Sequence, residues 1–412
     1  MEIAIGRITL FLYALMSQTF NKPDTDKSIM IIASALIDNG FLSRWHISLI
    51  SAFLSLAVVS GCASRPTAAV LQPVNLTEPT QQQVTLLSAT NRTRDGEGYG
   101  TDRGAVAFET YTVSIPPTHR LTQIEYPKAK PNPRRDMVVT ARKALSQTQF
   151  LSMARERVDA SGTVNIFVHG YNYRFQEALF RLVQFAADAK SRTGADPILF
   201  SWPSAGSLTG YVGDRDAALS SRQDLKSLII ALSKQPKVKR IVLFGHSMGG
   251  FLVMEVLQEL KIQGREDILK RLVVALAAPD IDAQVFRSQL EVVGTLPVPL
   301  TLFVSRDDKA LIASSFISGE RPRVGRLDVD DPRVQELAVK YGIRLIDISS
   351  LEGPDGLGHD RYASLAQFGP QLASLENRDG NAGARAGSFI FDVAGAAVSS
   401  PFRLVSSVLA PQ

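Results

Sequence analysis

Ser247 stands in a short segment whose residue types favour nucleophilic chemistry. An apolar, β-branched run over residues 240–244 stops at Gly245, Ser247 follows two positions later, and Gly249 leads into an apolar helical pattern. This order predicts a strand, a tight turn and a helix, with the serine held on the strained turn. Gly245 and Gly249 occupy the two places where a Cβ would collide with the folded-back chain. Because the helix starts directly after the serine, the Met248 amide is expected to point at an oxyanion formed there.

A serine hydroxyl needs a neighbouring base, and the histidines of the chain limit the choice. Histidine suits the role because its pKa of about 6.5 lets it accept and return a proton. His359 is the only one of the five histidines that lies downstream of Ser247, and it follows a glycine-rich segment. His246 lies inside the turn, where its side chain is expected to point away from that of Ser247. His359 is therefore the predicted base.

The third group of such a site is an acid that orients the imidazolium. In the chain order serine, acid, histidine it lies between Ser247 and His359, just past a strand. Four aspartates follow expected strands in that interval: Asp280, Asp282, Asp307 and Asp308. The residue pattern alone leaves these four open.

Apolar runs alternate with helical patterns along the chain, which predicts an α/β fold with a doubly wound, mostly parallel sheet. Strands are expected near residues 84–90, 108–115, 163–168, 197–204, 240–244, 271–276, 300–305 and 343–348. Helices are expected over residues 145–156, 175–190 and 216–233, and from 332. Residues 91–103 are rich in Gly, Asp and Arg and are expected to form an exposed loop. The site then lies at the carboxyl ends of the strands, with residues 309–341 as a candidate cap.

These motifs together resemble the alpha/beta-hydrolase superfamily. More narrowly, Phe-Val-His-Gly-Tyr-Asn at 167–172, Ser-Trp-Pro at 201–203 and Ala-Pro-Asp-Ile-Asp at 278–282 resemble a bacterial branch known as domain of unknown function 900. The likeness covers about residues 84–375. It implies an alpha/beta-hydrolase fold with a nucleophile elbow, and the hydrolysis of esters with no settled substrate.

The resemblance also implies roles for residues that the pattern leaves open. Relatives have a small residue at the end of a strand and the acid three positions later, which Ser305 and Asp308 match. Asp308 is therefore the predicted acid and Asp280 the alternative. The resemblance assigns the second oxyanion amide to Tyr171 and a loop-shaping role to His169.

Composition narrows the classes of function. The chain has 412 residues, 45% of them hydrophobic and 21% charged, as expected of a folded globular protein. A net charge of +5 without a binding motif predicts no nucleic-acid partner. A single cysteine excludes an internal disulfide and any multi-cysteine metal site. With no phosphate loop and no dinucleotide fingerprint, no cofactor and no metal are expected.

An apolar run over residues 47–59, preceded by Arg44, is too short to span a membrane and suits a signal-peptide core. It ends in Val-Ser-Gly-Cys at 59–62, which resembles the bacterial lipobox, so Cys62 is predicted to carry lipid at the mature N-terminus. The alternative is an uncleaved anchor with an idle cysteine. Residues 1–43 are expected to be either an over-extended start, with Met30 as the true one, or a real extension before the signal peptide. The absence of aspartate at the second mature position, Ala63, favours the outer membrane over the inner membrane, with the protein facing the periplasm.

The predicted organisation has four parts. Residues 1–62 form the leader, 63–80 a tether, 81–376 the hydrolase domain and 377–412 a tail rich in Ala, Gly and Ser. The predicted function is a membrane-tethered serine esterase or lipase-like hydrolase that forms an acyl-enzyme. Acyl transfer on the same triad and a non-catalytic envelope binding lipoprotein are the alternatives, and the oligomeric state stays open.

Overall fold

A computed structural model describes residues 65–76, 82–128, 130–189, 196–368 and 403–404, the last two by their backbone alone. The chain divides between Arg65 and Pro66 into two units, and every element named below belongs to the second. The predicted leader, with Cys62, lies outside the described residues.

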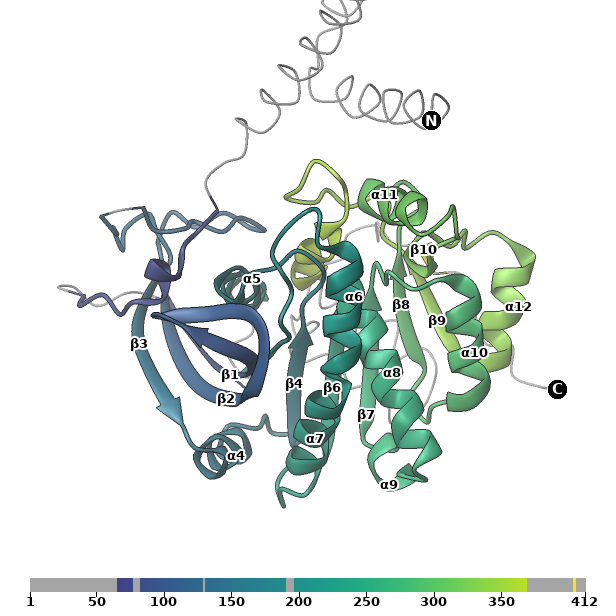
Figure 1. The fold of residues 1–412 in the computed structure, drawn as a ribbon, viewed down its shortest axis with the longest axis horizontal. Coiled ribbons are helices and arrows are strands. Elements are labelled where there is room, and N and C mark those ends of the chain that lie inside the picture. The colour runs from purple at the N-terminus through teal and green to yellow at the C-terminus, as the bar shows by residue number, and fades with distance from the viewer. Residues whose placement is uncertain (1–64, 77–81, 129, 190–195, 369–402, 405–412) are drawn as a thin grey trace, which may run out of the picture. The chain divides into compact units, whose positions relative to one another are not determined.

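The described strands form one sheet of ten in the order β10-β9-β8-β7-β6-β4-β5-β1-β2-β3 (Figure 1). Their bounds are β1 (Gln82–Asp95), β2 (Gly98–Ile115), β3 (Val138–Leu145), β4 (Thr163–Val168), β5 (Ile198–Ser201), β6 (Arg240–His246), β7 (Leu272–Ala277), β8 (Leu300–Val304), β9 (Ile343–Asp347) and β10 (Arg403–Leu404). The stretch from β9 to β1 pairs in parallel. Antiparallel strands extend it at both edges, β2 and β3 beyond β1 and β10 beyond β9. Parallel strands place all their carboxyl ends at one edge of the sheet, which is where the site is expected.

Helices cover both faces of the sheet (Figure 1). Their bounds are η1 (Ala68–Leu71), α4 (Gln147–Glu156), α5 (Phe175–Asp188), α6 (Tyr211–Ser220), α7 (Arg222–Ser233), α8 (Met248–Ile262), α9 (Glu266–Leu269), α10 (Ala283–Val293), α11 (Lys309–Ile317), η2 (Val324–Arg326), α12 (Pro332–Tyr341) and η3 (Asp360–Phe368). On β6, Leu243 belongs to the apolar cluster that includes residues of α7, α8 and α10, whereas the next residue, Phe244, contacts Phe185 of α5 and Tyr362 of η3. Successive residues of a strand point to opposite faces, so an apolar run such as β6 needs two layers of helices. The doubly wound, mostly parallel sheet predicted from the sequence is confirmed.

The segment over residues 91–103, predicted to be a loop, instead forms the long ends of β1 and β2. Arg92 pairs with Arg103 in the antiparallel register, and the tight turn includes Gly96 with a φ of 52°. The loop prediction was wrong because glycine and charged residues suggested solvent, whereas Arg92 is only 2% exposed. The strand β3 and the helix α10 were also absent from the prediction.

The helix predicted over residues 216–233 is two helices, α6 and α7, that meet at Ser221. The hydroxyl of Ser221 donates to the Ala217 carbonyl at 2.7 Å and accepts from the Asn91 side chain at 2.9 Å. A side chain that bonds the preceding turn and a neighbouring strand competes with a continuous helix.

Much of the predicted tether over residues 63–80 belongs to the folded domain. Val70 and Leu71 of η1 are buried, and the Val74 amide donates to the Val139 carbonyl at 2.8 Å. The polar composition of this stretch concealed two large apolar side chains, whose burial fixes it against the domain. Of the predicted tail, residues 403–404 pair with β9, and the rest lies outside the described residues. No helix in the described part of the chain is long and apolar enough to cross a bilayer.

Candidate active site

The turn between β6 and α8 holds Ser247 in a strained backbone conformation. Its φ is 52° and its ψ is −120°, a region that L-residues rarely adopt. The Ser247 amide donates to the Ala277 carbonyl at 2.9 Å, and the Gly250 amide donates to the Ser247 carbonyl at 2.9 Å. These bonds hold the turn, and the neighbouring strand β7 supports it.

The two flanking glycines are required by close backbone approach. A Cβ on Gly249 would lie 2.3 Å from the Val168 carbonyl oxygen, and one on Gly245 would lie 2.8 Å from the Gly250 Cα. Both distances are far shorter than a van der Waals contact. The atoms involved belong to the backbone, so they cannot rotate away as a side chain could. The elbow therefore accepts only glycine at these positions without a backbone shift.

The loop that follows β4 lies directly against the serine. A Cβ on Gly170 would be 2.9 Å from the Ser247 Cβ, so the backbone before Tyr171 touches the elbow. Met248 is the first residue of α8, and the first amides of a helix have no acceptor within it. The two segments expected to donate to an oxyanion thus meet at Ser247.

His359 and Asp308 are brought together from two loops, one after β9 and one after β8. The Nδ1 atom of His359 lies 2.7 Å from Oδ2 of Asp308. The other carboxylate oxygen, Oδ1, accepts from the Leu311 amide at 2.9 Å and so caps α11. Because Asp308 is fully buried and bonded through both oxygens, its position is tightly determined.

The loop of His359 is held against the elbow by further contacts. The Asp355 carboxylate accepts from the His359 amide at 3.0 Å and from the Asp360 amide at 3.1 Å. Asp360 pairs with the buried Arg181 of α5 at 3.0 Å. The His359 ring lies 4.7 Å from the ring of His246, the residue before Ser247, measured between centroids.

The charges around the two histidines set opposite protonation states. Burial lowers the pKa of His359, but the Asp308 carboxylate, aided by Asp360 and Asp355, raises it to about 9. Burial and the neighbouring His359 hold the pKa of His246 well below its usual range. His246 is therefore neutral, and His359 is the histidine that can carry a proton.

The other candidate acids have partners of their own. Asp280 lies 3.3 Å from Nε of the buried Arg323 and accepts from Ser314 at 2.9 Å. Asp282 caps α10, and Asp307 pairs with Arg361 at 2.7 Å. Of the four aspartates left open by the sequence pattern, Asp308 is the one that contacts His359.

A comparison with known families supports this arrangement of strands and loops. Residues 144–376 match the family model described as "Alpha/beta hydrolase of unknown function (DUF900)", which is more than half of the chain. The chain belongs to this family. It is therefore an alpha/beta hydrolase, and the predicted superfamily and branch are confirmed.

Two individual proteins resemble this alpha/beta hydrolase. Uncharacterized protein alr1448 of Nostoc sp. (strain PCC 7120) is 32% identical over 125 residues, which span 24% of this chain and 32% of that protein. The chain thus matches about a third of the length of this relative. The solved structure of esterase Est22 overlaps 81% of this chain and 90% of its own, with a TM-score of 0.34 and 13% identity. A similarity at that level carries no argument about substrate.

The alpha/beta hydrolase also relies on a residue that the sequence analysis did not identify. Arg92 of β1 donates through Nη1 to the carbonyls of Gly100 at 3.0 Å and Ser204 at 2.9 Å, and through Nη2 to that of Tyr173 at 2.8 Å. Its Nε donates to the Ser201 hydroxyl at 3.1 Å. Burial lowers the pKa of Arg92 to about 9, although the nearby carboxylates of Asp214 and Glu177 act to raise it. Arg92 ties the loops after β4 and β5 together, and its position in a supposed loop gave no signal of this.

His169 has a supporting place in the same network. Its Nδ1 lies 2.8 Å from the Gly170 carbonyl, so Nδ1 carries the proton and Nε2 accepts from Ser201 at 3.1 Å. Burial, with the nearby Arg92 charge, lowers the pKa of His169 to about 3. His169 is a neutral histidine that shapes the loop before Tyr171.

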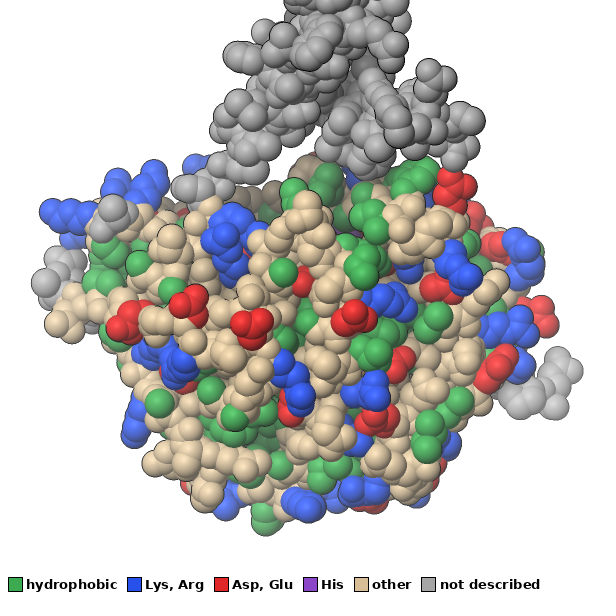
Figure 2. All heavy atoms as spheres, in the orientation of Figure 1, with side chains coloured by type: hydrophobic (Ala, Val, Ile, Leu, Met, Phe, Trp, Pro, Cys, Tyr) green, Lys and Arg blue, Asp and Glu red, His purple; other side chains and the backbone are tan. Residues whose placement is uncertain are grey.

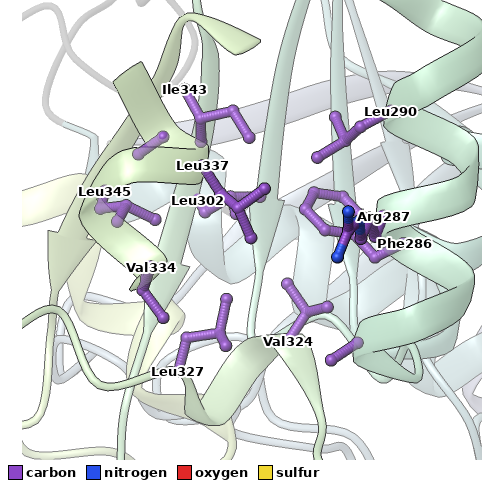
Figure 3. Close-up of a pocket in the computed structure, with 12 residues that line it drawn as sticks. Phe286, Arg287, Leu290, Leu302, Val324, Leu327, Val334, Leu337, Ile343 and Leu345 are labelled. Carbon is purple, nitrogen blue, oxygen red and sulfur yellow. The ribbon is translucent and has the colours of Figure 1, made fainter. Parts of the chain in front are cut away.

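An apolar cavity of about 60 Å³ lies between α10, α12 and the strands β8 and β9 (Figure 3). Its lining includes Phe286, Leu290, Leu337 and Leu345, and none of Ser247, His359 and Asp308 takes part. The cavity is a packing gap in the layer of helices. A second, more polar cavity of about 390 Å³ borders the loop before His359, between Asp307 and Asp355.

Proposed function

We propose that this protein is a serine hydrolase that cleaves carboxylic esters through an acyl-enzyme. The observation that carries the proposal is the 2.7 Å contact between Asp308 and His359, on a loop packed against the strained Ser247 elbow. A serine, a histidine and a buried acid in this arrangement are the groups that acyl transfer to water requires. The triad of Ser247, His359 and Asp308 is part of the proposal.

In the proposed reaction, neutral His359 takes the Ser247 proton through Nε2 while Oγ attacks the ester carbonyl. Asp308 accepts from Nδ1–H, which fixes the tautomer and stabilises the imidazolium. The amides of Met248 and Tyr171 donate to the oxyanion. The tetrahedral species then expels the alcohol, which takes its proton from His359, and the acyl group stays on Oγ. Water attacks next by the same route and releases the acid.

The proposed substrate is an acylated lipid or an acylated envelope molecule, met at a membrane. The apolar run over residues 47–59 and the lipobox-like sequence ending at Cys62 support this location. A lipidated Cys62 would carry two or three acyl chains, which is sufficient for stable anchoring. The proposed site of action is the bacterial envelope, on the periplasmic side and at the outer membrane. In cell fractions, the Cys62→Ala variant should leave the membrane pellet, and full retention there would refute the anchor.

The catalytic proposal is tested with a fluorophosphonate probe and a panel of p-nitrophenyl esters of increasing acyl length. We expect covalent labelling of the parent, and none of Ser247→Ala. His359→Ala should lose ester turnover while its thermal melting temperature stays close to that of the parent. A folded parent protein that takes up no label would contradict the proposal and leave a binding lipoprotein as the better reading. Ester exchange that outpaces hydrolysis when an alcohol is added would make the enzyme an acyltransferase.

A further inference from the structure

Large apolar side chains are exposed around the carboxyl edge of the sheet. Five of them, 44% to 75% exposed, lie in the segments that follow β5, β8 and β9: Leu208, Val212, Phe316, Ile317 and Leu357. Figure 2 shows hydrophobic side chains gathered over the upper ends of α6 and α11. We call these five residues the apolar rim. Large apolar side chains that cluster at a surface indicate an interaction site.

Contacts place one side of the apolar rim against the elbow. The Tyr171 hydroxyl donates to the Leu208 carbonyl at 2.6 Å, and the neighbouring Gly170 touches Ser247. Val212 lies in the first turn of α6, whose first residue, Tyr211, packs against Tyr171 with ring centroids 5.4 Å apart. Leu208 and Val212 therefore lie beside Tyr171, the residue after the glycine that touches Ser247.

The other side of the apolar rim belongs to α11 and to the loop of His359. The Asp280 amide donates to the Ser247 carbonyl at 3.2 Å, and the Asp280 side chain accepts from Ser314 of α11 at 2.9 Å. Phe316 and Ile317 are the last two residues of that helix. Leu357 lies two positions before His359, and its carbonyl accepts from the Lys309 amide at 3.0 Å. The apolar rim thus borders the proposed active site on both sides.

The chain enters the folded domain at this same edge. The Gln176 side chain donates to the Pro66 carbonyl at 2.7 Å. Gln176 lies in the first turn of α5, directly after the loop that approaches Ser247. Cys62 precedes Pro66 by four residues, which span at most about 14 Å when fully extended. An anchor at Cys62 would therefore keep Pro66, and with it the first turn of α5, within about that distance of the lipid-bearing residue.

We propose that the carboxyl edge of the sheet rests on a lipid surface through the apolar rim. The inference rests on the proposed function and names its substrate class, because an ester in that surface would reach Ser247 without crossing bulk water. Apolar side chains at such a contact enter the boundary between head groups and acyl chains. The short link to Cys62 would limit how far this edge can move from the membrane.

The test uses depth-dependent fluorescence quenching on the full chain in a Ser247→Ala background, which prevents turnover of the lipid. The protein is reconstituted in phosphatidylcholine–phosphatidylglycerol vesicles whose acyl chains carry bromine. Phe316→Trp and Leu208→Trp each place an indole in the apolar rim. The matched control is Ile262→Trp, since Ile262 is 69% exposed and ends α8, which runs away from the elbow. The background signal of Trp202, the tryptophan that follows Cys62, is measured with the Ser247→Ala protein that carries no added indole.

We expect bromine to reduce the added indole emission at positions 316 and 208 and to leave position 262 unchanged. Equal quenching at all three positions, or none at 316 and 208, would overturn the proposal. A Phe316→Trp emission that shifts with protein concentration, without vesicles, would assign the apolar rim to a second copy of the chain. Fluorophosphonate labelling of the parent distinguishes the two proposals. If the parent is labelled but the apolar rim is not quenched, only the proposed membrane contact is refuted. A quenched rim on an unlabelled protein would reject only the hydrolase.

Discussion

Replacing Asp308 with asparagine removes a negative charge and reverses a hydrogen bond at the His359 ring. The Leu311 amide donates to Oδ1 at 2.9 Å, so it retains the carbonyl oxygen of the new side chain. The amide nitrogen then takes the place of Oδ2, which lies 2.7 Å from Nδ1 of His359 in the parent. An NH₂ group at that position donates to Nδ1, so the proton of the neutral ring lies on Nε2. Because Nε2 must be unprotonated to accept the Ser247 proton, this tautomer of His359 cannot act as the base.

The Asp308→Asn substitution should change two quantities, kcat and the pKa of His359. With the wrong tautomer, kcat should fall by about 10⁴-fold. The pKa of His359 is raised from 6.5 to about 9 in the parent, which corresponds to about 3 kcal/mol in favour of the imidazolium. The Asp308 carboxylate raises this pKa more than Asp360 or Asp355 does, so the pKa of His359 should fall in the variant.

The assay is the rate of hydrolysis of a soluble p-nitrophenyl ester from about pH 5 to about pH 10. The base acts when neutral, so kcat/KM of the parent should rise with pH through an apparent pKa of about 9. The residual activity of Asp308→Asn should rise at lower pH than that. Asp307→Asn is the matched control, because Asp307 is the adjacent carboxylate and pairs with Arg361 instead. A loss below tenfold in Asp308→Asn, or a larger loss in Asp280→Asn, would refute the assignment.

Three other substitutions test the elbow, the loops beside it and a histidine elsewhere in the domain. Gly249→Ala places a Cβ 2.3 Å from the Val168 carbonyl oxygen, so probe labelling should be lost and the melting temperature should fall. Arg92→Met leaves one buried and two partly buried carbonyls without the Arg92 donor and should lower the free energy of unfolding by about 3 kcal/mol in urea titrations. His119 is partly buried, which lowers its pKa, but hydrogen bonds to Asp188 and a second carboxylate raise it to about 9. This stabilisation is complete below about pH 6.5 and is lost as the pH rises through about 9, so His119→Asn should destabilise more at about pH 7 than at about pH 10. Equal destabilisation at both pH values would contradict the charge argument for His119. Unchanged labelling of Gly249→Ala would contradict the steric argument, and an unchanged free energy of unfolding in Arg92→Met would contradict the role of its hydrogen bonds.

The layered sheet was predictable because its signals repeat along the chain. Buried parallel strands such as β4, β6 and β7 are continuous apolar runs, and each is followed by a helical pattern. The hairpin ends of β1 and β2 were missed, since a strand that carries Arg92 and Arg94 looks like a solvated loop. The residues of η1 were missed for a related reason, because two buried side chains stand in a polar stretch.

The elbow could be predicted from consecutive residues alone. Its strand, its glycines, Ser247 and the first turn of α8 are consecutive residues, and local sterics decide their backbone conformation. The order of residues also left His359 as the single downstream histidine. Which aspartate faces that histidine depends on the packing of the loops, because the candidates follow neighbouring parallel strands and differ by contacts between distant loops. The same packing places Arg92 against the loops of the site, and it places Pro66 at the edge of the sheet where the site lies. These contacts join residues far apart in the chain, and no local pattern records which of them will meet.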